Sequence, residues 1–454
     1  MTTDHVTPEQ FAATMRALAS AERLEPDEER REKLASLNSR YAVINWHGRT
    51  LVVSRPIDPI TGRRTLQLSS LGDFKSWMIN RGRVGRQPMA EWWLEHEQRA
   101  QYEGVVFMPP GAGEAPGYLN LWQGWACEPR AGDCSAWLEL VREVICSGDE
   151  QLYRYVVGWC ADAVQNICER PGITLVLLGK QGTGKGTFAR EFGALYGDHF
   201  LHLRNSRLLT GNFNAHLTNA LMVFADEAIY PGDKQSEGAL KGMITEPTIP
   251  IEFKGKDVVT VKNHIRVIMA SNHEWVVPAA LDDRRFCIIE VDNKHQRDEL
   301  YFERVRAQMA NGGREALLEY LMKFDLSGLR LREIPDTVAR HVQQLHSMDP
   351  VQAFWFDLLK THPQLWGQMV KIDTLFEQYL KSAGKFPLHR VAFGVRAHTL
   401  FPTLRHVRPR SMNREAYYCL PELPEARQQF AASVGRTFDW EAETAPETDD
   451  TPQM

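Results

Sequence analysis

Residues 179–187, Gly-Lys-Gln-Gly-Thr-Gly-Lys-Gly-Thr, have the composition and spacing of a phosphate-binding loop. Glycine lets the backbone fold around an anion with its amides pointing inward, and the helix expected next offers its N-terminus to the same phosphates. Lys185 adds a mobile positive charge for the outer phosphates. We therefore expect a nucleoside triphosphate to be bound by Gly179, Gln181, Gly182, Thr183, Gly184, Lys185, Gly186 and Thr187.

One position departs from the pattern G-x-x-x-x-G-K-[ST]. Gly186 stands where the magnesium-binding hydroxyl is expected, and Thr187 comes one position late. Nucleotide kinases share this shift, so the loop alone leaves a kinase open. Thr187 is the candidate magnesium ligand on this segment.

Two acids follow the next strongly apolar run, Ala220-Leu-Met-Val-Phe-Ala-Asp-Glu. A core strand ending in this way delivers Asp226 to magnesium and Glu227 to the attacking water. The alternative is that both acids merely end a buried strand. The phosphate loop upstream favours the catalytic interpretation.

A further apolar run, Ile265-Arg-Val-Ile-Met-Ala-Ser-Asn, ends in Asn272. Its amide could hold the lytic water or sense the outer phosphate by hydrogen bonding, although a polar strand end is also an ordinary loop start.

Two arginines, Arg284 and Arg285, follow a pair of aspartates and precede another strand-like segment. A guanidinium from a neighbouring subunit can neutralise charge on a transferring phosphoryl group. The alternative is a surface ion-pair cluster with the aspartates. We expect one catalytic and one structural arginine.

These residues need a scaffold in which several strands end at one edge. Strand and helix patterns alternate from residue 173 to about 329, as in an α/β domain with a parallel sheet covered by helices. Apolar residues at three- and four-residue spacing, interrupted at Ser147 and Gly148, predict two helices before this α/β domain. After the domain, two predicted helices and a hairpin follow one another in the order of a winged helix. The predicted parts are a charged helical arm (1–40), an accessory α+β domain (41–135), a helical collar (136–172), the P-loop ATPase domain (173–330), a winged-helix-like domain (331–425) and an acidic disordered tail (426–454).

Composition narrows the class of protein. The 454 residues are 43% hydrophobic, with no apolar run of about 18 residues and no signal-peptide pattern, so we expect a cytoplasmic protein without a membrane partner. Seven cysteines without a C-x-x-C pair indicate neither a zinc ribbon nor a disulfide framework.

The charge distribution is uneven despite a net charge of only −5. Residues 385–414 hold seven Lys or Arg, three His and no acid, whereas residues 438–454 hold six acids and no base. We predict contacts to duplex or forked DNA from this basic segment, with a solvated basic face as the alternative. The predicted contact residues are Arg390, Arg396, Arg405, Arg408 and Arg410.

The order of loop, acids, asparagine and arginines resembles the superfamily 3 helicases, specifically the helicase part of phage and plasmid primase-helicases. The resemblance extends to Gly104-Val-Val-Phe-Met-Pro, Asn120-Leu-Trp-Gln-Gly-Trp and Phe213-Asn-Ala-His-Leu. It implies an AAA+-like fold, ATP and Mg²⁺ as cofactors, single-stranded and forked DNA as partners, and a homo-oligomer, expected to be a hexameric ring. It places the family's roles on Lys185, Asp226, Glu227, Asn272 and one of the paired arginines.

Such helicases carry a further basic motif between the acids and the asparagine. Here Ile249-Pro-Ile-Glu-Phe-Lys-Gly-Lys-Asp-Val-Val-Thr-Val-Lys reads as a hairpin with Lys254 and Lys256 at its tip. In a ring these lysines would track the phosphates of a single strand. The alternative is a solvated turn.

Relatives often carry a primase or polymerase domain in front, which needs clustered acids on strands. Residues 1–130 contain no Asp-x-Asp or comparable pair on a strand-like run, so we expect a separate primase or polymerase. Two other functions stay open: a nucleotide kinase-like phosphotransferase, and an initiator that uses ATP only to assemble on DNA.

Overall fold

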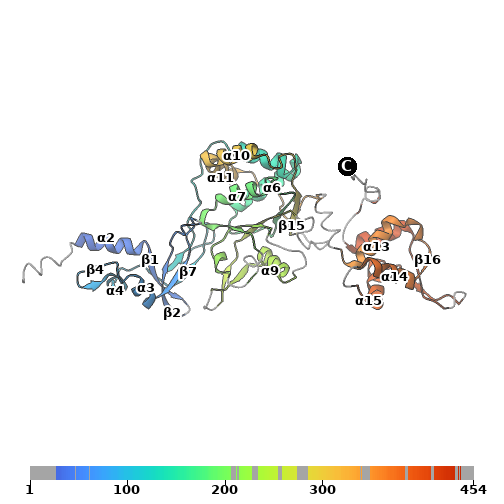
Figure 1. Cartoon of the computed structure of the whole chain (residues 1–454), viewed down its shortest axis with the longest axis horizontal. Coiled ribbons are helices and arrows are strands. Elements are labelled where there is room, and N and C mark those ends of the chain that lie inside the picture. Colours follow the sequence, from blue (N-terminus) through green and yellow to red (C-terminus); the bar gives the residue numbers. More distant parts are fainter. Residues whose placement is uncertain are drawn as a thin grey trace, which may run out of the picture. The chain divides into compact units, whose positions relative to one another are not determined.

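The structure is a computed structural model of the whole chain. It describes residues 27–46, 48–60, 62–205, 211, 214–227, 234–253, 258–272, 285–337, 339, 348–383, 387–410, 414–434, 438 and 440 (Figure 1). Backbone contacts divide the chain into two units. The first comprises residues 1–127 with 194–201 and 216–221, and the second comprises the rest.

The N-terminal unit is built on a four-stranded sheet of order β3-β2-β1-β6. β1 (Tyr41–Trp46) and β2 (Arg49–Ser54) form an antiparallel hairpin in which Val43 faces Val52. Valine at both positions suits a pleated, half-buried surface. The other elements are α2 (Asp27–Asn38), β3 (Gln67–Ser70), α3 (Leu71–Trp77), β4 (Arg83–Val84), β5 (Gln87–Pro88), α4 (Met89–Glu95), β6 (Gln101–Tyr102), β7 (Gly104–Val106), β8 (Tyr118–Asn120) and η2 (Gly197–His199).

Three helices cover the Val43 face of this sheet. Phe74 of α3 and Trp93 of α4 pack there with Leu34 and Leu37 of α2. α2 lies within the predicted charged helical arm, and its apolar side chains belong to the core of this unit.

Two helical segments precede the phosphate loop, as the spacing predicts. The first runs through α5 (Ser135–Glu139) and the π-helical η1 (Leu140–Ile145), and the second is α6 (Glu150–Gln165). The chain turns between them at Ser147 and Gly148, which both have positive φ. Trp137 and Trp159 are fully buried, so these helices are part of the core of the second unit.

The second unit contains the predicted parallel sheet, with strand order β10-β11-β14-β9-β15. Its strands are β9 (Thr174–Leu178), β10 (Phe200–Leu203), β11 (Met222–Asp226), β14 (Arg266–Ser271) and β15 (Phe286–Glu290), and β14 lies between the phosphate-loop strand β9 and the acid-bearing strand β11. β9 and β14 are buried along their whole length, which explains their continuous apolar runs.

Helices lie on both faces of this sheet (Figure 1). α6, α7 (Lys185–Ala194), α10 (Glu299–Gln308) and α11 (Arg314–Lys323) are on one side, and α9 (Lys234–Thr245) is on the other. Smaller elements are η3 (Ala215–Leu217), β12 (Thr248–Ile251), β13 (Val259–Lys262) and η4 (Met309–Gly313).

The C-terminal part has a core of its own, centred on Trp355, Phe393 and Phe401. α14 (Ile372–Ser382), α15 (Arg390–Leu400) and the antiparallel pair β17 (Arg405–Val407) and β18 (Tyr417–Cys419) follow one another in the predicted order. The sequence did not predict β16 (Met369–Lys371), which makes β18 the central strand of three. α13 (Pro350–Thr361) and η5 (Pro363–Leu365) precede them.

The predicted disordered tail begins too early. α16 (Leu423–Val434) continues through its first nine residues, and Ala426, Phe430 and Val434 are buried in the C-terminal core. Their spacing of four residues forms an apolar face of a helix. Within the described residues, no helix is long and apolar enough to cross a membrane.

Candidate nucleotide site at the carboxyl edge of the parallel sheet

The phosphate loop leaves the buried strand β9 and enters α7. Gly179, Gly182 and Gly184 have φ values of 146°, 82° and 97°, which side-chain-bearing residues rarely adopt. A Cβ on Gly184 would also lie 2.7 Å from Phe302. The loop therefore needs glycine there for both its conformation and its packing, and it leads directly to the free amides at the start of α7.

Lys185 is the first residue of α7, and its side chain folds back over the loop. Its Nζ donates to the carbonyl oxygens of Gly179 and Lys180, the latter at 2.8 Å, and to Asn272 Oδ1 at 3.0 Å. Burial lowers the pKa of Lys185 to about 8, although Asp226 and Glu227 favour its charged form. The ammonium group thus lies where the loop would receive phosphates.

Asn272 connects this lysine to the predicted catalytic acid. Its Nδ2 donates to Glu227 Oε1 while its Oδ1 accepts from Lys185. Asn272 follows β14 and Glu227 follows β11, so two neighbouring parallel strands deliver them to one edge of the sheet. Glu227 has a positive φ of 54°, and its amide donates to Ala270 O at 2.9 Å. This strained backbone position fixes the direction in which the carboxylate leaves the strand.

Asp226 lies at the end of β11 and is held by a histidine that the motifs did not indicate. His202 Nε2 lies 3.2 Å from Asp226 Oδ2, and the His202 ring stacks on Phe224. The hydrogen bond from His202, with the charges of Arg204 and Arg190, lowers the pKa of Asp226. Asp226 is therefore ionised at neutral pH, as a magnesium ligand must be.

The Arg190 guanidinium lies beside Gly186, the unusual glycine of the loop. Gly186 and Arg190 are one turn apart on α7, and a Cβ on Gly186 would lie 2.6 Å from Arg190 Nη1. A serine or threonine at position 186 would therefore need the Arg190 guanidinium, the end of a flexible side chain, to move. Thr187 is buried within α7.

The segment after β15 braces the phosphate loop from outside. The Arg297 amide donates to Gly182 O at 2.9 Å, and Gln296 Nε2 donates to Gln181 O at 3.1 Å. The Arg297 side chain lies against Gly182, where a Cβ would meet its Cγ at 3.1 Å. No motif links these positions, which are more than a hundred residues from the loop.

Arg285 lies at the opposite edge of the sheet. Its carbonyl accepts from the Thr174 amide at 2.7 Å, so it stands beside the start of β9, whereas the phosphate loop follows the end of that strand. Five strand residues span about 16 Å, which separates Arg285 from the loop of its own chain. Arg284 lies outside the described residues.

The structure contains the two strands of the predicted basic hairpin. β12 and β13 pair antiparallel, with Ile251 opposite Val259. Lys254 and Lys256, at the predicted tip, lie outside the described residues.

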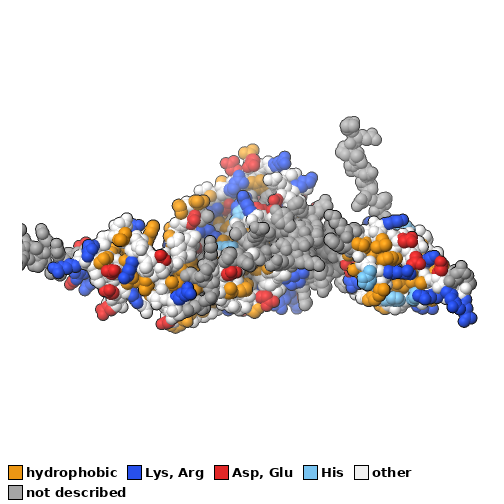
Figure 2. Space-filling model, turned by 60° about the horizontal axis from the view of Figure 1, so that its bottom comes forward, with side chains coloured by type: hydrophobic (Ala, Val, Ile, Leu, Met, Phe, Trp, Pro, Cys, Tyr) orange, Lys and Arg blue, Asp and Glu red, His pale blue; other side chains and the backbone are white. Residues whose placement is uncertain are grey.

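The basic C-terminal segment divides into paired and exposed arginines. Arg390 forms an ion pair with Asp373 at 2.6 Å, and Arg396 donates through Nε and Nη2 to Asp349 Oδ2. Arg405, Arg408 and Arg410 are exposed and form no ion pair within the part of the chain that the structure describes. Figure 2 shows blue and pale-blue side chains on the visible face of this part. The carboxylates reduce the availability of the first two arginines to DNA, which leaves the last three as the stronger candidates.

Comparisons with known proteins agree with the resemblance to phage proteins that the sequence motifs indicate. Residues 177–285 match a family of unknown function (DUF5906). A DNA primase-polymerase of Nitratiruptor phage NrS-1 is 28% identical over 181 residues, which are 39% of this chain and 25% of that protein. The matching part thus spans only a quarter of that relative.

The fold is shared with the same phage protein over a greater length. Two apo structures of the NrS-1 C-terminal region superpose with TM-scores of 0.62 and 0.63 at 17% identity. Each covers 85% of this chain, which in turn covers 97% and 98% of those chains. The resemblance of this chain to phage primase-helicase proteins is thereby confirmed, in sequence over 181 residues and in fold over most of the chain.

Proposed function

We propose that this chain is an ATP-hydrolysing, ring-forming DNA helicase that acts in the replication of a phage, prophage or plasmid. The observation that carries the proposal is the hydrogen-bonded series Lys185–Asn272–Glu227 at the carboxyl edge of the sheet. A phosphate-binding lysine, a polar sensor and a carboxylate base on three different elements are the parts that phosphoryl transfer to water requires.

The residues at this edge suit ATP and Mg²⁺. The glycine loop and the start of α7 would hold the phosphates by backbone amides, and Lys185 would leave its carbonyl partners to pair with the outer phosphates. Asp226 would hold the metal ion, with Thr187 as the second candidate ligand. Bound Mg²⁺ supplies charge neutralisation on the transferring phosphoryl group.

Glu227 would act as the base that orients and deprotonates water, and Asn272 would hold that water or report on the outer phosphate. Asn272 engages both Lys185 and Glu227, so phosphate binding to Lys185 would release the amide oxygen. Occupancy of the loop and orientation of the base are thereby coupled.

A shared site between subunits is supported by the position of Arg285. Since Arg285 lies at the edge of the sheet opposite to its own phosphate loop, it is poorly placed to act within one chain. Either it or Arg284 would complete the site of a neighbouring subunit, which makes a ring the expected assembly. Single-stranded DNA would contact Lys254 and Lys256, and forked DNA would contact Arg405, Arg408 and Arg410. A separate primase or polymerase is the expected replication partner.

The test is an ATPase assay with and without single-stranded DNA, combined with the mass of the complex under ATP. We expect DNA to stimulate hydrolysis and the mass to be that of a ring of identical subunits. Phosphate transfer to a nucleoside monophosphate without DNA would favour a kinase instead. Assembly without strand separation on a fork would favour an initiator.

A further inference from the structure

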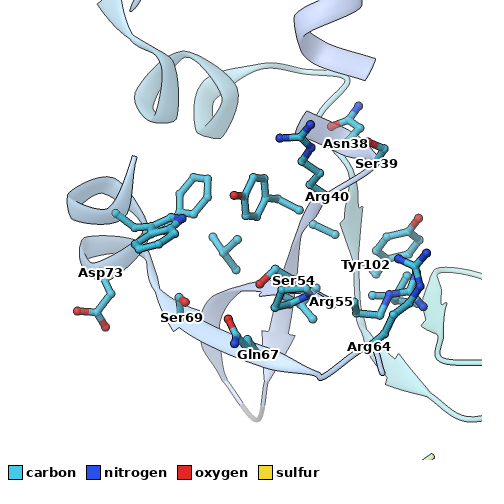
Figure 3. A pocket seen from close by; sticks show the side chains of 18 residues that line it. Asn38, Ser39, Arg40, Ser54, Arg55, Arg64, Gln67, Ser69, Asp73 and Tyr102 are labelled. Carbon is cyan, nitrogen blue, oxygen red and sulfur yellow. The ribbon is translucent and has the colours of Figure 1, made fainter. Parts of the chain in front are cut away.

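A cavity of about 740 Å³ lies in the N-terminal unit and is lined by residues 38–119 only (Figure 3). It opens where β2 ends at Ser54 and β1 begins at Tyr41, and Gln67 and Ser69 of β3 form its floor. This volume is in the range of small-ligand sites, about 300–1,000 Å³. Its lining combines aromatic rings with polar side chains.

One end of the cavity is basic. Arg55 is half-buried, and its Nη1 donates a long hydrogen bond of 3.5 Å to the carbonyl oxygen of Asn120. Arg64 lies beside it in Figure 3, next to Tyr102. Asp198 forms its ion pair with Arg64, with Nε 3.7 Å from Oδ2, and the described residues contain no ion pair of Arg55.

This arrangement leaves positive charge uncompensated. Burial and the neighbouring charge of Arg64 lower the pKa of Arg55, and Tyr102 and the single carboxylate of Asp198 offset this only in part. Two guanidinium groups that repel each other in a partly buried cavity are stabilised when an anion binds between them. Arginine forks also match the geometry of phosphate oxygens.

The other end of the cavity is aromatic. Trp77 is 64% exposed at the end of α3, an unusual position for so large an apolar side chain, and Arg81 stacks over its ring at 5.8 Å. Tyr41 and Phe74 line the wall, with ring centroids 5.0 Å apart. An exposed indole beside polar side chains is suited to stacking on a flat ring, such as a nucleobase.

The acidic group in the lining keeps the two ends distinct. Asp73 lies at the end of the cavity far from Arg55 and Arg64 (Figure 3). It accepts a hydrogen bond from Ser70 Oγ at 2.7 Å at the start of α3. Asp73 repels a phosphate from its own end of the cavity, whereas at the other end the guanidinium groups of Arg55 and Arg64 outnumber the one carboxylate of Asp198.

We propose that this cavity binds a nucleoside phosphate, with its phosphate on Arg55 and Arg64 and its base against Trp77 and Tyr41. The ligand is either a free nucleotide or one unit of a DNA single strand, because both present the same base and phosphate. The site shares no residue with the phosphate loop and does not depend on ATP hydrolysis.

The test is photocrosslinking of the full chain, followed by mapping of the modified peptides by mass spectrometry. One arm uses 8-azido-ATP and the other an oligodeoxynucleotide that carries 5-iodouracil. We expect adducts on peptides that contain Tyr41 or Trp77. Adducts with the oligonucleotide alone would identify the strand as the source, adducts with the azido nucleotide alone would identify a free nucleotide, and adducts with both would fit either source.

Arg55→Gln should reduce these adducts at least tenfold. Arg49→Gln is the matched control, because Arg49 is an exposed arginine at the other end of β2 and outside the cavity. Adducts on the phosphate-loop peptide of the 8-azido-ATP arm serve as an internal reference, so failure of the ATP site is distinguished from failure of this one.

Trp77→Ala is a second variant that removes an exposed side chain and should lower the Tyr41 adduct without lowering the melting temperature. The proposal is overturned if neither probe modifies the cavity, or if folded Arg55→Gln and Arg49→Gln proteins give equal yields there.

Discussion

The Lys185 ammonium group lies 3.0 Å from Asn272 Oδ1, although the two residues are 87 positions apart. Asn272 in turn donates to Glu227, so one amide side chain holds both the phosphate-binding lysine and the predicted base. Two groups that engage one amide are coupled, and a change at one should alter the effect of a change at the other.

Removal of the lysine should abolish ATP hydrolysis. Lys185→Ala deletes the only mobile cation that the described residues place directly on the loop carbonyls. We expect at least a hundredfold loss in kcat/KM, measured as phosphate release, with an unchanged melting temperature. Hydrolysis at the wild-type rate would remove the loop from the reaction.

Nucleotide binding should depend on pH through this residue. Since burial lowers the pKa of Lys185 to about 8, ATP binding should take up protons above pH 8 and weaken as pH rises. Calorimetric titration in two buffers of different ionisation enthalpy measures this uptake. Lys185→Arg, which stays charged, is the control and should show no uptake in this range.

The same pKa predicts a change in stability. Between pH 8 and 10.5 the unfolded chain binds more protons than the folded chain, so the contribution of Lys185 to the free energy of unfolding rises with pH in that window.

Glu227 and Asn272 should behave as a unit. Glu227→Gln should lower the hydrolysis rate by about 10²–10⁴, the range of a general base, while ATP still binds. Asn272→Ala should also slow hydrolysis, and the double variant should lose much less than the product of the two single effects. Single-turnover rates check this. Strictly multiplicative losses would contradict the coupling.

Gly186→Ser should fail to improve metal binding even though it restores the common loop pattern. The new side chain has to displace the Arg190 guanidinium, whose charge lowers the pKa of Asp226, so we expect Mg²⁺ to support ATPase activity no better than in the wild type. The double variant with Arg190→Ala leaves room for the serine and should differ from Gly186→Ser in its Mg²⁺ requirement. If Gly186→Ser alone bound Mg²⁺ more tightly, Arg190 would not be the reason for the glycine.

Substitutions in the basic C-terminal segment should have two different effects, one on DNA binding and one on stability. Arg408→Ala should weaken DNA binding and reduce its salt dependence, since it removes an exposed charge. Arg396→Ala should instead lower the free energy of unfolding by about 1 kcal/mol, because Arg396 holds the Asp349 cap of α13. Thermal unfolding and fork binding over a salt series distinguish them. Equal salt slopes in the Arg408→Ala and wild-type proteins would exclude Arg408 from the interface.

The sequence predicted those parts of the site that depend on strand ends. Lys185, Glu227 and Asn272 each follow an apolar run, and parallel strands bring such ends to one edge. His202 and Arg297 were missed because their roles come from pairing across the fold, which no spacing along the chain reveals. Arg190 is only one helical turn from Gly186, but no motif marks it.

In the C-terminal region, too, contacts between distant residues could not be predicted from the sequence. The segment 385–414 is free of acids along the chain, yet Arg390 and Arg396 find carboxylates at Asp373 and Asp349, outside that segment. The acidic composition near the end of the chain similarly obscured the apolar face of α16.

The most direct test of the helicase proposal is strand separation on a forked duplex, with wild-type and Glu227→Gln proteins at equal DNA occupancy. We expect ATP-dependent release of the displaced strand by the wild type and none by Glu227→Gln. Equal release by both proteins, or ATP hydrolysis by the wild type without any strand release, would contradict it.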